Sequence, residues 1–393
     1  MSKLRTNGRR SRRSSWGSCL WLGLLGLFVF DASQAATFRV PSESPTIQAA
    51  IDSAAVNDTV QVAPGTYRGD GNRDLNFHGK DLVVYSEGGA AATILDVEGN
   101  IDAPHRGVTF DSGETRAALF QGFTIVNGFK AAQPSLRGGR ADPRHDLSAG
   151  GILVQYSSPV LRDLVISRCQ SDYAGGGVEI ELNSEALVEN VRIEGCVSNQ
   201  IGGGLSVERL AAPELINVVV VGNFAPDGGG VSVGPAHPVF RGLLIAGNAA
   251  FSRGGGLFCT GFAQVELERA TIWNNCGGRG AEIFAEAASP VLARCSVVDS
   301  SQVEFDLTGA VEFDQACRFV DPRFCAPVDC ANAPTIEGDY RVASASICLP
   351  EHSACGEVIG VLGLGPCGIS PIERTTWGLL KARYGGAGRR ATN

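Results

Sequence analysis

The sequence predicts an all-β fold, a single-stranded parallel β-helix, in which the chain winds as a solenoid. Three observations predict it: a fixed repeat length, short segments rich in Val and Ile, and glycine runs at matching places. Glycine runs, or a degenerate copy of one, precede six apolar residues: Ile152, Val178, Leu205, Val231, Leu257 and Ile283. Their spacings are 26, 27, 26, 26 and 26 residues, and a constant period of this length indicates a solenoid. Helical repeats are excluded because the segments alternate with period two and are cut by Gly and Pro.

A second set of apolar residues recurs in phase with the first. Its members are Ile166, Ile193, Val220, Ile245, Ile272 and Val297. Three residues after each of them stands a small or polar residue: Cys169, Cys196, Asn223, Asn248, Asn275 and Ser300. Successive coils of a β-helix stack about 4.8 Å apart, so we expect equivalent residues to lie in columns. The three asparagines are predicted to form a ladder whose side-chain amides hydrogen-bond from coil to coil.

The glycine runs are explained by a corner that every coil must turn. Gly177, Gly204, Gly230 and Gly256 each end a run and stand directly before a strand. A sharp corner needs a positive φ or the close approach of two backbones, and glycine allows both because it has no Cβ. We therefore predict a structural role for these glycines. They are not phosphate-binding loops, because strands and not helices follow them.

The open end of a solenoid needs a cap, and the sequence predicts one near the N-terminus. Residues 44–55 read SPTIQAAIDSAA. Ser44 suits the N-cap of a helix and Pro45 its first position. Ile47, Ala50 and Ile51 then follow at helical spacing, which gives the helix one apolar face to lie on the first coil.

The chain is predicted to hold one folded domain between a targeting segment and a tail. Arginines followed by a short apolar run and small residues are typical of a cleaved signal peptide, which indicates secretion without a membrane span in the mature protein. The predicted parts are a signal peptide (1–35), a β-helix (37–370) with regular coils (150–300) and a Cys-rich end (317–367), a projecting loop (129–147) and a tail (371–393).

The charge of the chain excludes some partners. Its formal net charge is −8, from 33 Lys and Arg against 41 Asp and Glu. Removal of residues 1–35 takes away six basic residues and one acidic residue, which leaves 27 − 40 = −13. Such a surface repels nucleic acids and anionic membranes, and it tolerates cations and neutral sugars.

Eleven of the 12 cysteines follow the predicted signal peptide, and in an exported protein they are disulfide candidates. Six crowd the C-terminal end and are expected to form up to three bridges of unknown pairing: Cys317, Cys325, Cys330, Cys348, Cys355 and Cys367. Cys169 and Cys196 fall in register on adjacent coils, so they are either a disulfide or reduced members of the ladder column. Cys259 falls at an inward position and is expected to be a core thiol.

Several stretches resemble one known group of proteins. TIQAAIDSAAVNDTVQVAPGTY (46–67), FHGKDLVVYSEGG (77–89), GFTIVNG (122–128) and the glycine-run coils are similar to secreted bacterial right-handed parallel β-helix repeat proteins of the pectin-lyase-like fold. The coil ends VGN, AGN and WNN more weakly resemble repeats of polymorphic outer-membrane proteins, which suggests the cell envelope. The resemblance implies a right-handed solenoid and does not specify an activity, because the group holds enzymes, adhesins and proteins of other roles. One departure is Asn57, where the group usually has glycine.

Enzymes of that fold act on polysaccharides through carboxylates, often with Ca²⁺, on the outer face of one sheet. The register predicts that Glu179, Glu181 and Glu208 face outward on two adjacent coils. Carboxylates one coil apart repel each other unless a cation lies between them, and oxygen ligands suit Ca²⁺. The cluster is compatible with a solvated acidic face, a Ca²⁺ site or an acid/base pair. Arg209 follows Glu208, but the register predicts that it points inward or into a turn.

The same register places Phe258 and Phe284 outward on neighbouring coils. Stacked rings suit the apolar face of a sugar, and a covering loop or tail is the alternative interpretation. The favoured function is a secreted or cell-surface module that binds glycans or envelope components without catalysis, with no cofactor. The alternatives are a polysaccharide lyase or glycoside hydrolase that uses the glutamates, and an autotransporter passenger domain.

Overall fold

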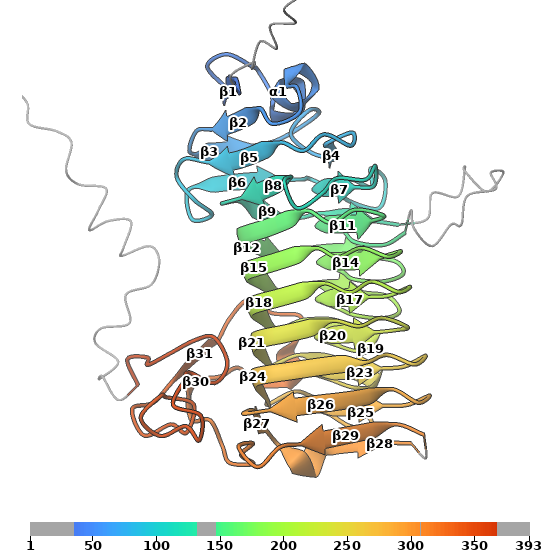
Figure 1. The fold of residues 1–393 in the computed structure, drawn as a ribbon, viewed down its shortest axis with the longest axis vertical. Helices are drawn as coiled ribbons and strands as arrows, with labels where there is room; N and C mark the ends of the chain where they lie inside the picture. Colours follow the sequence, from blue (N-terminus) through green and yellow to red (C-terminus); the bar gives the residue numbers. More distant parts are fainter. Residues whose placement is uncertain (1–34, 132–146, 307, 368–393) are drawn as a thin grey trace, which may run out of the picture. The chain divides into compact units, whose positions relative to one another are not determined.

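The computed structural model describes residues 35–131, 147–306 and 308–367. Three parallel sheets, here called sheets A, B and C, form the sides of a β-solenoid (Figure 1). Each strand pairs with the equivalent strand of the next coil, as the repeat predicts. The predicted signal peptide and tail lie outside the described residues, and so does most of the projecting loop. No helix in the described ranges is long and apolar enough to cross a membrane.

The strands of the solenoid recur in the order B, A, C along each regular coil. Sheet A consists of β1 (Thr37–Val40), β2 (Thr59–Val62), β3 (Gly65–Tyr67), β5 (Val83–Ser86), β6 (Thr93–Asp96), β8 (Leu119–Gln121), β9 (Thr124–Val126), β12 (Val160–Ser167), β15 (Leu187–Glu194), β18 (Glu214–Val221), β21 (Val239–Ala246), β24 (Val265–Trp273), β26 (Pro290–Arg294), β27 (Val297–Val298) and β29 (Ala310–Phe313). Sheet B consists of β4 (Leu75–Asn76), β7 (Val108–Phe110), β11 (Ile152–Gln155), β14 (Val178–Glu181), β17 (Leu205–Val207), β20 (Val231–Val233), β23 (Leu257–Cys259), β25 (Ile283–Ala285) and β28 (Val303–Phe305).

Sheet C is the shortest side of the solenoid. It consists of β10 (Phe129–Lys130), β13 (Gln170–Ser171), β16 (Val197–Ser198), β19 (Phe224–Asp227) and β22 (Ala249–Arg253). An antiparallel pair, β30 (Phe324–Ala326) and β31 (Asp339–Val342), follows the last coils. Within the described ranges the helices are α1 (Ile47–Ser53) and two short 3-10 turns, Ser300–Gln302 and Cys330–Asn332.

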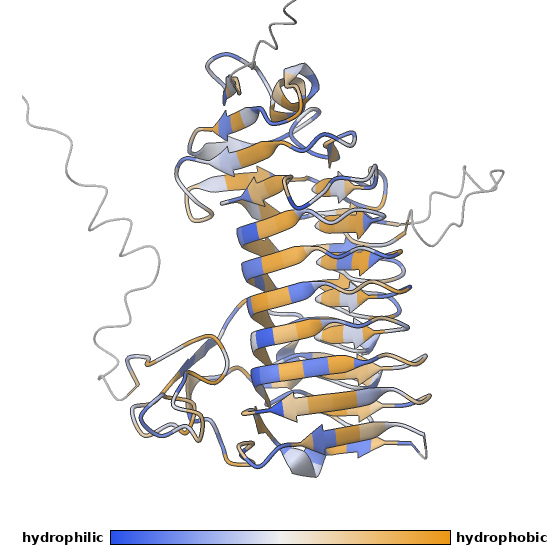
Figure 2. Cartoon of the chain, viewed as in Figure 1, coloured by the Kyte–Doolittle hydropathy of each residue, from blue (hydrophilic) through white to orange (hydrophobic). Residues whose placement is uncertain are grey.

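The predicted columns are confirmed by the pairing of the strands. Ile166 pairs with Ile193, Ile193 with Val220, and Val220 with Ile245, so the second apolar set forms one stack. These side chains are at most 1% exposed and belong to a single core that runs through the coils. Apolar residues occupy corresponding positions on β15, β18 and β21 in Figure 2. Each coil is therefore stable only because its neighbours cover it.

The N-terminal helix begins two residues later than the sequence predicts. The N-cap is Thr46, whose hydroxyl accepts a hydrogen bond from the Ala49 N–H, and not Ser44. Ile47, Ala50 and Ile51 are fully buried, so the predicted apolar face does lie against the first coils. Asn57 has φ of 71°, a left-handed conformation that asparagine tolerates better than most residues.

The predicted asparagine ladder is present and is buried. Asn223 Nδ2 donates to Asn248 Oδ1 at 2.9 Å, and Asn248 Nδ2 donates to Asn275 Oδ1 at 2.9 Å. The second hydrogen of each Nδ2 goes to a backbone carbonyl, for example that of Val220. Because every amide is paired, the ladder adds hydrogen bonds between coils without leaving a buried polar group unsatisfied.

The third glycine of each run makes room for this ladder. A Cβ on Gly230 would lie 2.9 Å from Asn248 Nδ2, and a Cβ on Gly204 or Gly256 would meet its own asparagine at the same distance. At Gly177 the corresponding neighbour is Cys196 Sγ, at 3.2 Å. The structural role predicted for these glycines is confirmed, and its cause is close packing, since only the first glycine of each run has a positive φ.

Glu282 ends the ladder, at the position that the third glycine occupies in the earlier coils. Its carboxylate accepts hydrogen bonds from Asn275 Nδ2 at 2.5 Å and from the Asn275 N–H at 3.1 Å. Burial raises the pKa of Glu282 to about 7, against the lowering effect of those two hydrogen bonds. The side chain is 2% exposed, so its ionisation is coupled to the stability of the last coils.

The C-terminal end is bridged differently from the sequence expectation. Cys325–Cys367 joins two of the six expected cysteines. Cys330 instead pairs with Cys276, and Cys355 with Cys295, across 54 and 60 residues. The reason is that the segment after β29 folds back onto sheet A, where Tyr340 packs against β18 and β21. In Figure 1, β30 and β31 lie beside the solenoid.

The other five cysteines of the described ranges are reduced and buried. Cys317 and Cys348, expected to form disulfides, are free, as are Cys169, Cys196 and Cys259. Cys196 N–H donates to Asn223 Oδ1 at 2.8 Å, so Cys196 stands directly above the ladder. The structure thus favours the ladder interpretation of Cys169 and Cys196 over the disulfide. Cys259 is a core thiol, as predicted, and burial raises its pKa.

Glu282→Gln is expected to change how stability depends on pH. The folded-state pKa lies above the ordinary value of 4.5, so the stability linked to Glu282 is full below about pH 4.5 and is lost as the pH rises through about 7. The loss is about 3 kcal/mol in free energy of unfolding. Urea unfolding at pH 5 and pH 8 should show that loss in the wild type and not in the variant, with Glu337→Gln as an exposed control. Equal pH dependence of all three proteins would contradict this role.

Replacing both cysteines of one bridge by serine should distinguish a disulfide that ties the C-terminal segment to the solenoid from the one that closes within the segment. Cys276–Cys330 ties the C-terminal segment to the solenoid, and a loop of this size is worth about 4 kcal/mol. Its removal should speed proteolytic cleavage around Cys330, although Cys295–Cys355 still ties the later part of the segment to the solenoid. Removal of Cys325–Cys367, which closes within the segment, should leave that cleavage slow. Limited proteolysis followed by mass spectrometry measures both, and equal cleavage would show that the Cys276–Cys330 bridge does not hold this part of the segment.

Candidate functional site

The residues predicted for the outer face of sheet B do form two columns. Glu179 pairs with Ser206, which pairs with Ser232, and the column continues through Phe258 to Phe284. These side chains point away from the solenoid interior: Phe258 and Phe284 are buried but stand outside the main core, which contains their neighbours. The predicted direction of the side chains is therefore right.

The predicted exposure of this face is wrong. Glu179 is 1% exposed and Glu181 2%, while Glu208 is half-buried. The cause is the glycine corner, which turns back over the strand that follows it. A Cβ on Gly202 would lie 3.1 Å from the Cβ of Ser206, and one on Gly228 would lie 3.0 Å from that of Ser232. The corner thus covers the first outward residue of each strand, so the face is not an open acidic surface.

Burial dominates the electrostatics of the glutamates. Burial raises the pKa of Glu179 well above its ordinary value, and the charges of Glu181 and Glu208 raise it further. Ser148 and the Arg106 guanidinium partly oppose this. Glu179 Oε2 and the Ser206 hydroxyl have no hydrogen-bond partner among the described residues. A neutral Glu179 fits these surroundings, because a buried carboxylate without paired charge is costly.

Arg209 lies in the turn after β17, which is one of its two predicted directions. Its Nε lies 3.6 Å from Glu181 Oε2, so the guanidinium is on the glutamate side and not in the interior. Among the described residues, the group whose ligand atoms lie close enough for a metal ion is Cys276, Asp329 and Cys330, and its two sulfurs form a disulfide. The three glutamates are not such a group, so their geometry gives the Ca²⁺ interpretation no support.

The two phenylalanines form a stack that is closed by arginine. The ring centroids of Phe258 and Phe284 are 6.2 Å apart with 21° between the planes. The Arg253 guanidinium lies 4.7 Å above Phe258, and that of Arg279 lies 4.6 Å above Phe284. Phe258 is 3% exposed and Phe284 0%, so these rings are not a platform for sugars. The alternative interpretation, that the rings are covered, holds, and the cover is formed by side chains of the preceding corner.

Arg253 is fixed over the rings by two carboxylates. It donates to both oxygens of Asp227 at 3.0 and 2.8 Å, and to both oxygens of Glu286 at 2.8 Å. Asp227 and Arg253 lie on β19 and β22 of sheet C, whereas Glu286 follows β25 of sheet B. The arginine therefore links the corner column to the face that the corner covers.

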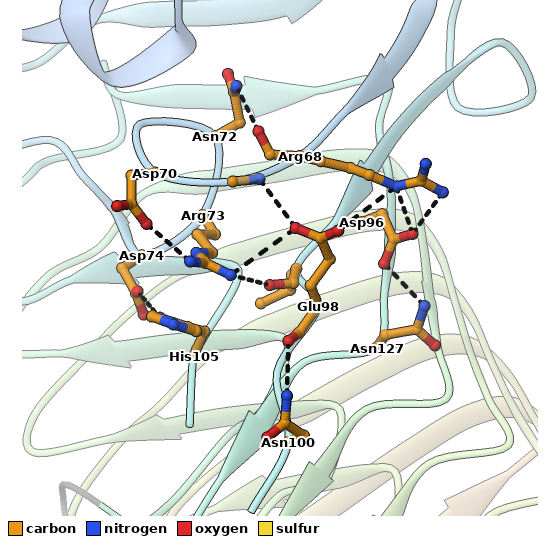
Figure 3. Close-up of polar contacts among 12 residues, drawn as sticks. Arg68, Asp70, Asn72, Arg73, Asp74, Asp96, Glu98, Asn100, His105 and Asn127 are labelled. Carbon is orange, nitrogen blue, oxygen red and sulfur yellow. Dashed lines mark hydrogen bonds and ion pairs between the residues drawn. The ribbon is translucent and has the colours of Figure 1, made fainter. Parts of the chain in front are cut away.

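A second polar cluster lies on the irregular N-terminal coils (Figure 3). Arg68 contacts Asp96 at 2.9 Å and Glu98 at 4.0 Å, while Arg73 contacts Glu98 at 3.9 Å. Burial raises the pKa of Asp96, but hydrogen bonds from Asn127 and Arg68 outweigh it, so the pKa is lowered overall. The cluster forms cross-coil contacts of the kind that hold coils together.

Within this cluster, His105 and Asp74 form the pair best suited to acid–base chemistry. His105 Nδ1 lies 2.5 Å from Asp74 Oδ2, and Asp74 Oδ1 accepts the Arg106 N–H at 2.8 Å. A carboxylate on Nδ1 orients an imidazole and leaves Nε2 as a base. Sequence reasoning missed the pair because the two residues are 31 apart in coils that lack the 26-residue period.

Three exposed apolar side chains of the regular coils occur at the turn between sheets B and A. Tyr156, Leu210 and Phe262 are 60%, 61% and 71% exposed. Each is held by a backbone hydrogen bond to the next coil, with φ values of 52°, 66° and 70°. Asn183 occupies the same position in the coil between Tyr156 and Leu210, and its N–H likewise donates to the next coil. The three apolar side chains thus recur every second coil, roughly 10 Å apart along the axis.

Comparison with known proteins gives a likeness of fold. The crystal structure of pectate lyase Pel9A is similar, with 13% sequence identity and a TM-score of 0.39 over 85% of this chain and 97% of that chain. No protein-family model matches the sequence, and no curated protein sequence matches it. The likeness to Pel9A assigns no role to any residue.

Arg253→Gln is expected to destabilise the protein by about 1–3 kcal/mol, because Asp227 and Glu286 lose their shared partner and Phe258 loses its cover. Arg294→Gln is the matched control. Its pair with Glu266 is exposed on both sides, so its loss should cost under about 0.5 kcal/mol. Urea denaturation measures both. Similar small losses would show that Arg253 is not part of the structural cover.

Proposed function

We propose that this protein is an extracellular or cell-envelope module that binds glycans without catalysis, through the row of Tyr156, Leu210 and Phe262. The observation that carries the proposal is that two aromatic rings and a leucine occupy exposed, left-handed backbone positions. A bulky residue with positive φ costs of order 1 kcal/mol or more. Asn183 shows that the same turn accepts the residue that this conformation prefers.

The row suits an extended and uncharged polymer. Its members are spaced evenly along the stacking direction. Each lies on the turn between sheets B and A of its own coil, and the stacked coils hold these turns in place. Apolar rings can pack on the C–H faces of sugar rings. The chain's net charge of −8 disfavours anionic ligands. Three disulfides support an oxidising compartment, which agrees with the predicted signal peptide.

Burial of Glu179 and Glu181 weakens the alternative that they act as catalytic acids in a lyase or hydrolase. A catalytic carboxylate must reach the bond it protonates, and both are at most 2% exposed. The Asp74–His105 pair is the one observation that favours a second candidate, an enzyme that removes a proton from a polysaccharide. His105 is 24% exposed at its side chain, with Nδ1 already fixed by Asp74.

Substituting asparagine in the row tests the binding proposal. Tyr156→Asn and Phe262→Asn should each weaken retention on insoluble cellulose, chitin or galactan at least several-fold, because the ring is lost. The free energy of unfolding should stay equal or rise by up to about 1 kcal/mol, because asparagine relieves the left-handed strain. Sedimentation with the polysaccharide and urea denaturation measure the two effects.

Phe251→Asn is the matched control, because Phe251 is 82% exposed but lies on β22 of sheet C. It should leave retention unchanged. Retention that is absent in the wild type, or that all three variants reduce equally, would overturn the proposal. Release of unsaturated products from a uronate polymer, abolished by His105→Ala, would favour the enzyme instead.

A further inference from the structure

A cavity of about 430 Å³ lies at the C-terminal end of the solenoid, away from the row. Its lining residues are Arg318, Val320, Asp321, Arg323, Ala345, Ile347 and His352. They come from two segments, one between β29 and β30 and one after β31. A cavity of this volume is large enough for a small organic ligand.

The walls of the cavity are fixed to the solenoid and to each other. Arg318 extends the stack on β27: its N–H donates to Ser296 O at 2.8 Å, and its carbonyl accepts the Val298 N–H at 3.1 Å. The Ser346 hydroxyl donates to Pro322 O at 2.6 Å, which ties one wall to the other. The Cys295–Cys355 disulfide holds the second wall against the last coils. A ligand would therefore find a formed site and would not have to order it.

The charge of the lining is opposite to that of the chain. Arg318 and Arg323 outnumber Asp321, whereas the chain carries a net charge of −8. Arg318 Nη1 is held by the carbonyls of Gln315 and Cys317 at 2.9 and 2.8 Å, which orients its guanidinium. These contacts give one fixed cation inside the cavity.

Arg323 supplies hydrogen-bond donors that have no partner among the described residues. Its N–H donates to Asp321 Oδ1 at 2.7 Å, but its guanidinium makes no ion pair or hydrogen bond with the residues that the structure describes. His352 Nδ1 lies 3.0 Å from Ser346 O, and a carbonyl only accepts, so Nδ1 carries the hydrogen and Nε2 remains for a ligand. An unpaired guanidinium that lines the same cavity as a fixed one is suited to a carboxylate, which it can bind with two parallel hydrogen bonds.

We propose that this cavity binds a small hydroxycarboxylic acid, of which sugar acids are one kind. The carboxylate pairs with the Arg323 and Arg318 guanidiniums. Asp321 and His352 Nε2 accept hydrogen bonds from hydroxyl groups, while Val320 and Ile347 pack against the carbon skeleton. The site uses a different part of the molecule and a different ligand charge from the row, so the two proposals stand or fall separately.

Isothermal titration of the full chain with D-glucuronate, D-glucose and acetate tests the site. D-glucuronate should bind with a Kd in the range of roughly 10 μM to 1 mM, and D-glucose should not bind at those concentrations. Arg323→Gln should weaken D-glucuronate binding at least about 10-fold, because it removes charge-assisted hydrogen bonds. Its thermal unfolding should stay unchanged, because the guanidinium has no folded-state partner among the described residues.

Two further variants make the result decisive. Arg294→Gln removes an exposed arginine of the solenoid and should leave binding unchanged. Asp321→Asn keeps the oxygen that accepts the Arg323 N–H but removes the negative charge, so acetate should bind more tightly and the preference for D-glucuronate over acetate should shrink. Absence of D-glucuronate binding, or equal weakening by Arg323→Gln and Arg294→Gln, would overturn the site.

Discussion

The in-register stacking of coils is the constraint on which the rest of the structure depends. Backbone hydrogen bonds between equivalent strands fix one column for every position of the repeat, and each side chain then has to fit the same neighbour above and below. The ladder of Asn223, Asn248 and Asn275 shows the consequence, since each amide donates both to the ladder residue of the next coil, Glu282 at the end, and to a backbone carbonyl. Gly204 and Gly230 leave space for the asparagine amides, because any larger side chain at these positions would meet the amide.

This constraint explains which parts of the molecule the sequence could predict. Period, inward columns, ladder and glycines follow from residue spacing alone, because stacking converts spacing directly into contact. The outward direction of the Glu179 and Phe258 side chains was predicted from residue spacing in the same way. Their burial was not, because it depends on how the corner at Gly175 or Gly254 turns back over the strand, and spacing carries no information on that path.

The ends of the solenoid lie outside the reach of the same reasoning. Asp74 and His105 meet across irregular coils, and Cys330 and Cys355 reach back to coils 54 and 60 residues earlier. No period relates these residues, so their partners depend on tertiary packing. The Thr46 cap differs from the Ser44 expectation by two residues, a local error of the usual size for helix boundaries.

Stacking also limits where a ligand can bind. Inward columns are filled by apolar side chains, and the outer face of sheet B is closed by its own corners and by Arg253. Positions that neither stack inward nor lie under a corner are left, chiefly the turn that carries Tyr156 and Phe262 and the aperiodic C-terminal segment. In the coils that carry Tyr156, Asn183, Leu210 and Phe262 the backbone at this turn is left-handed, so its geometry there is set by the fold, while the side chain is free to differ. A large apolar residue there adds backbone strain and gains no burial. A contribution to the stability of the solenoid therefore does not explain its presence.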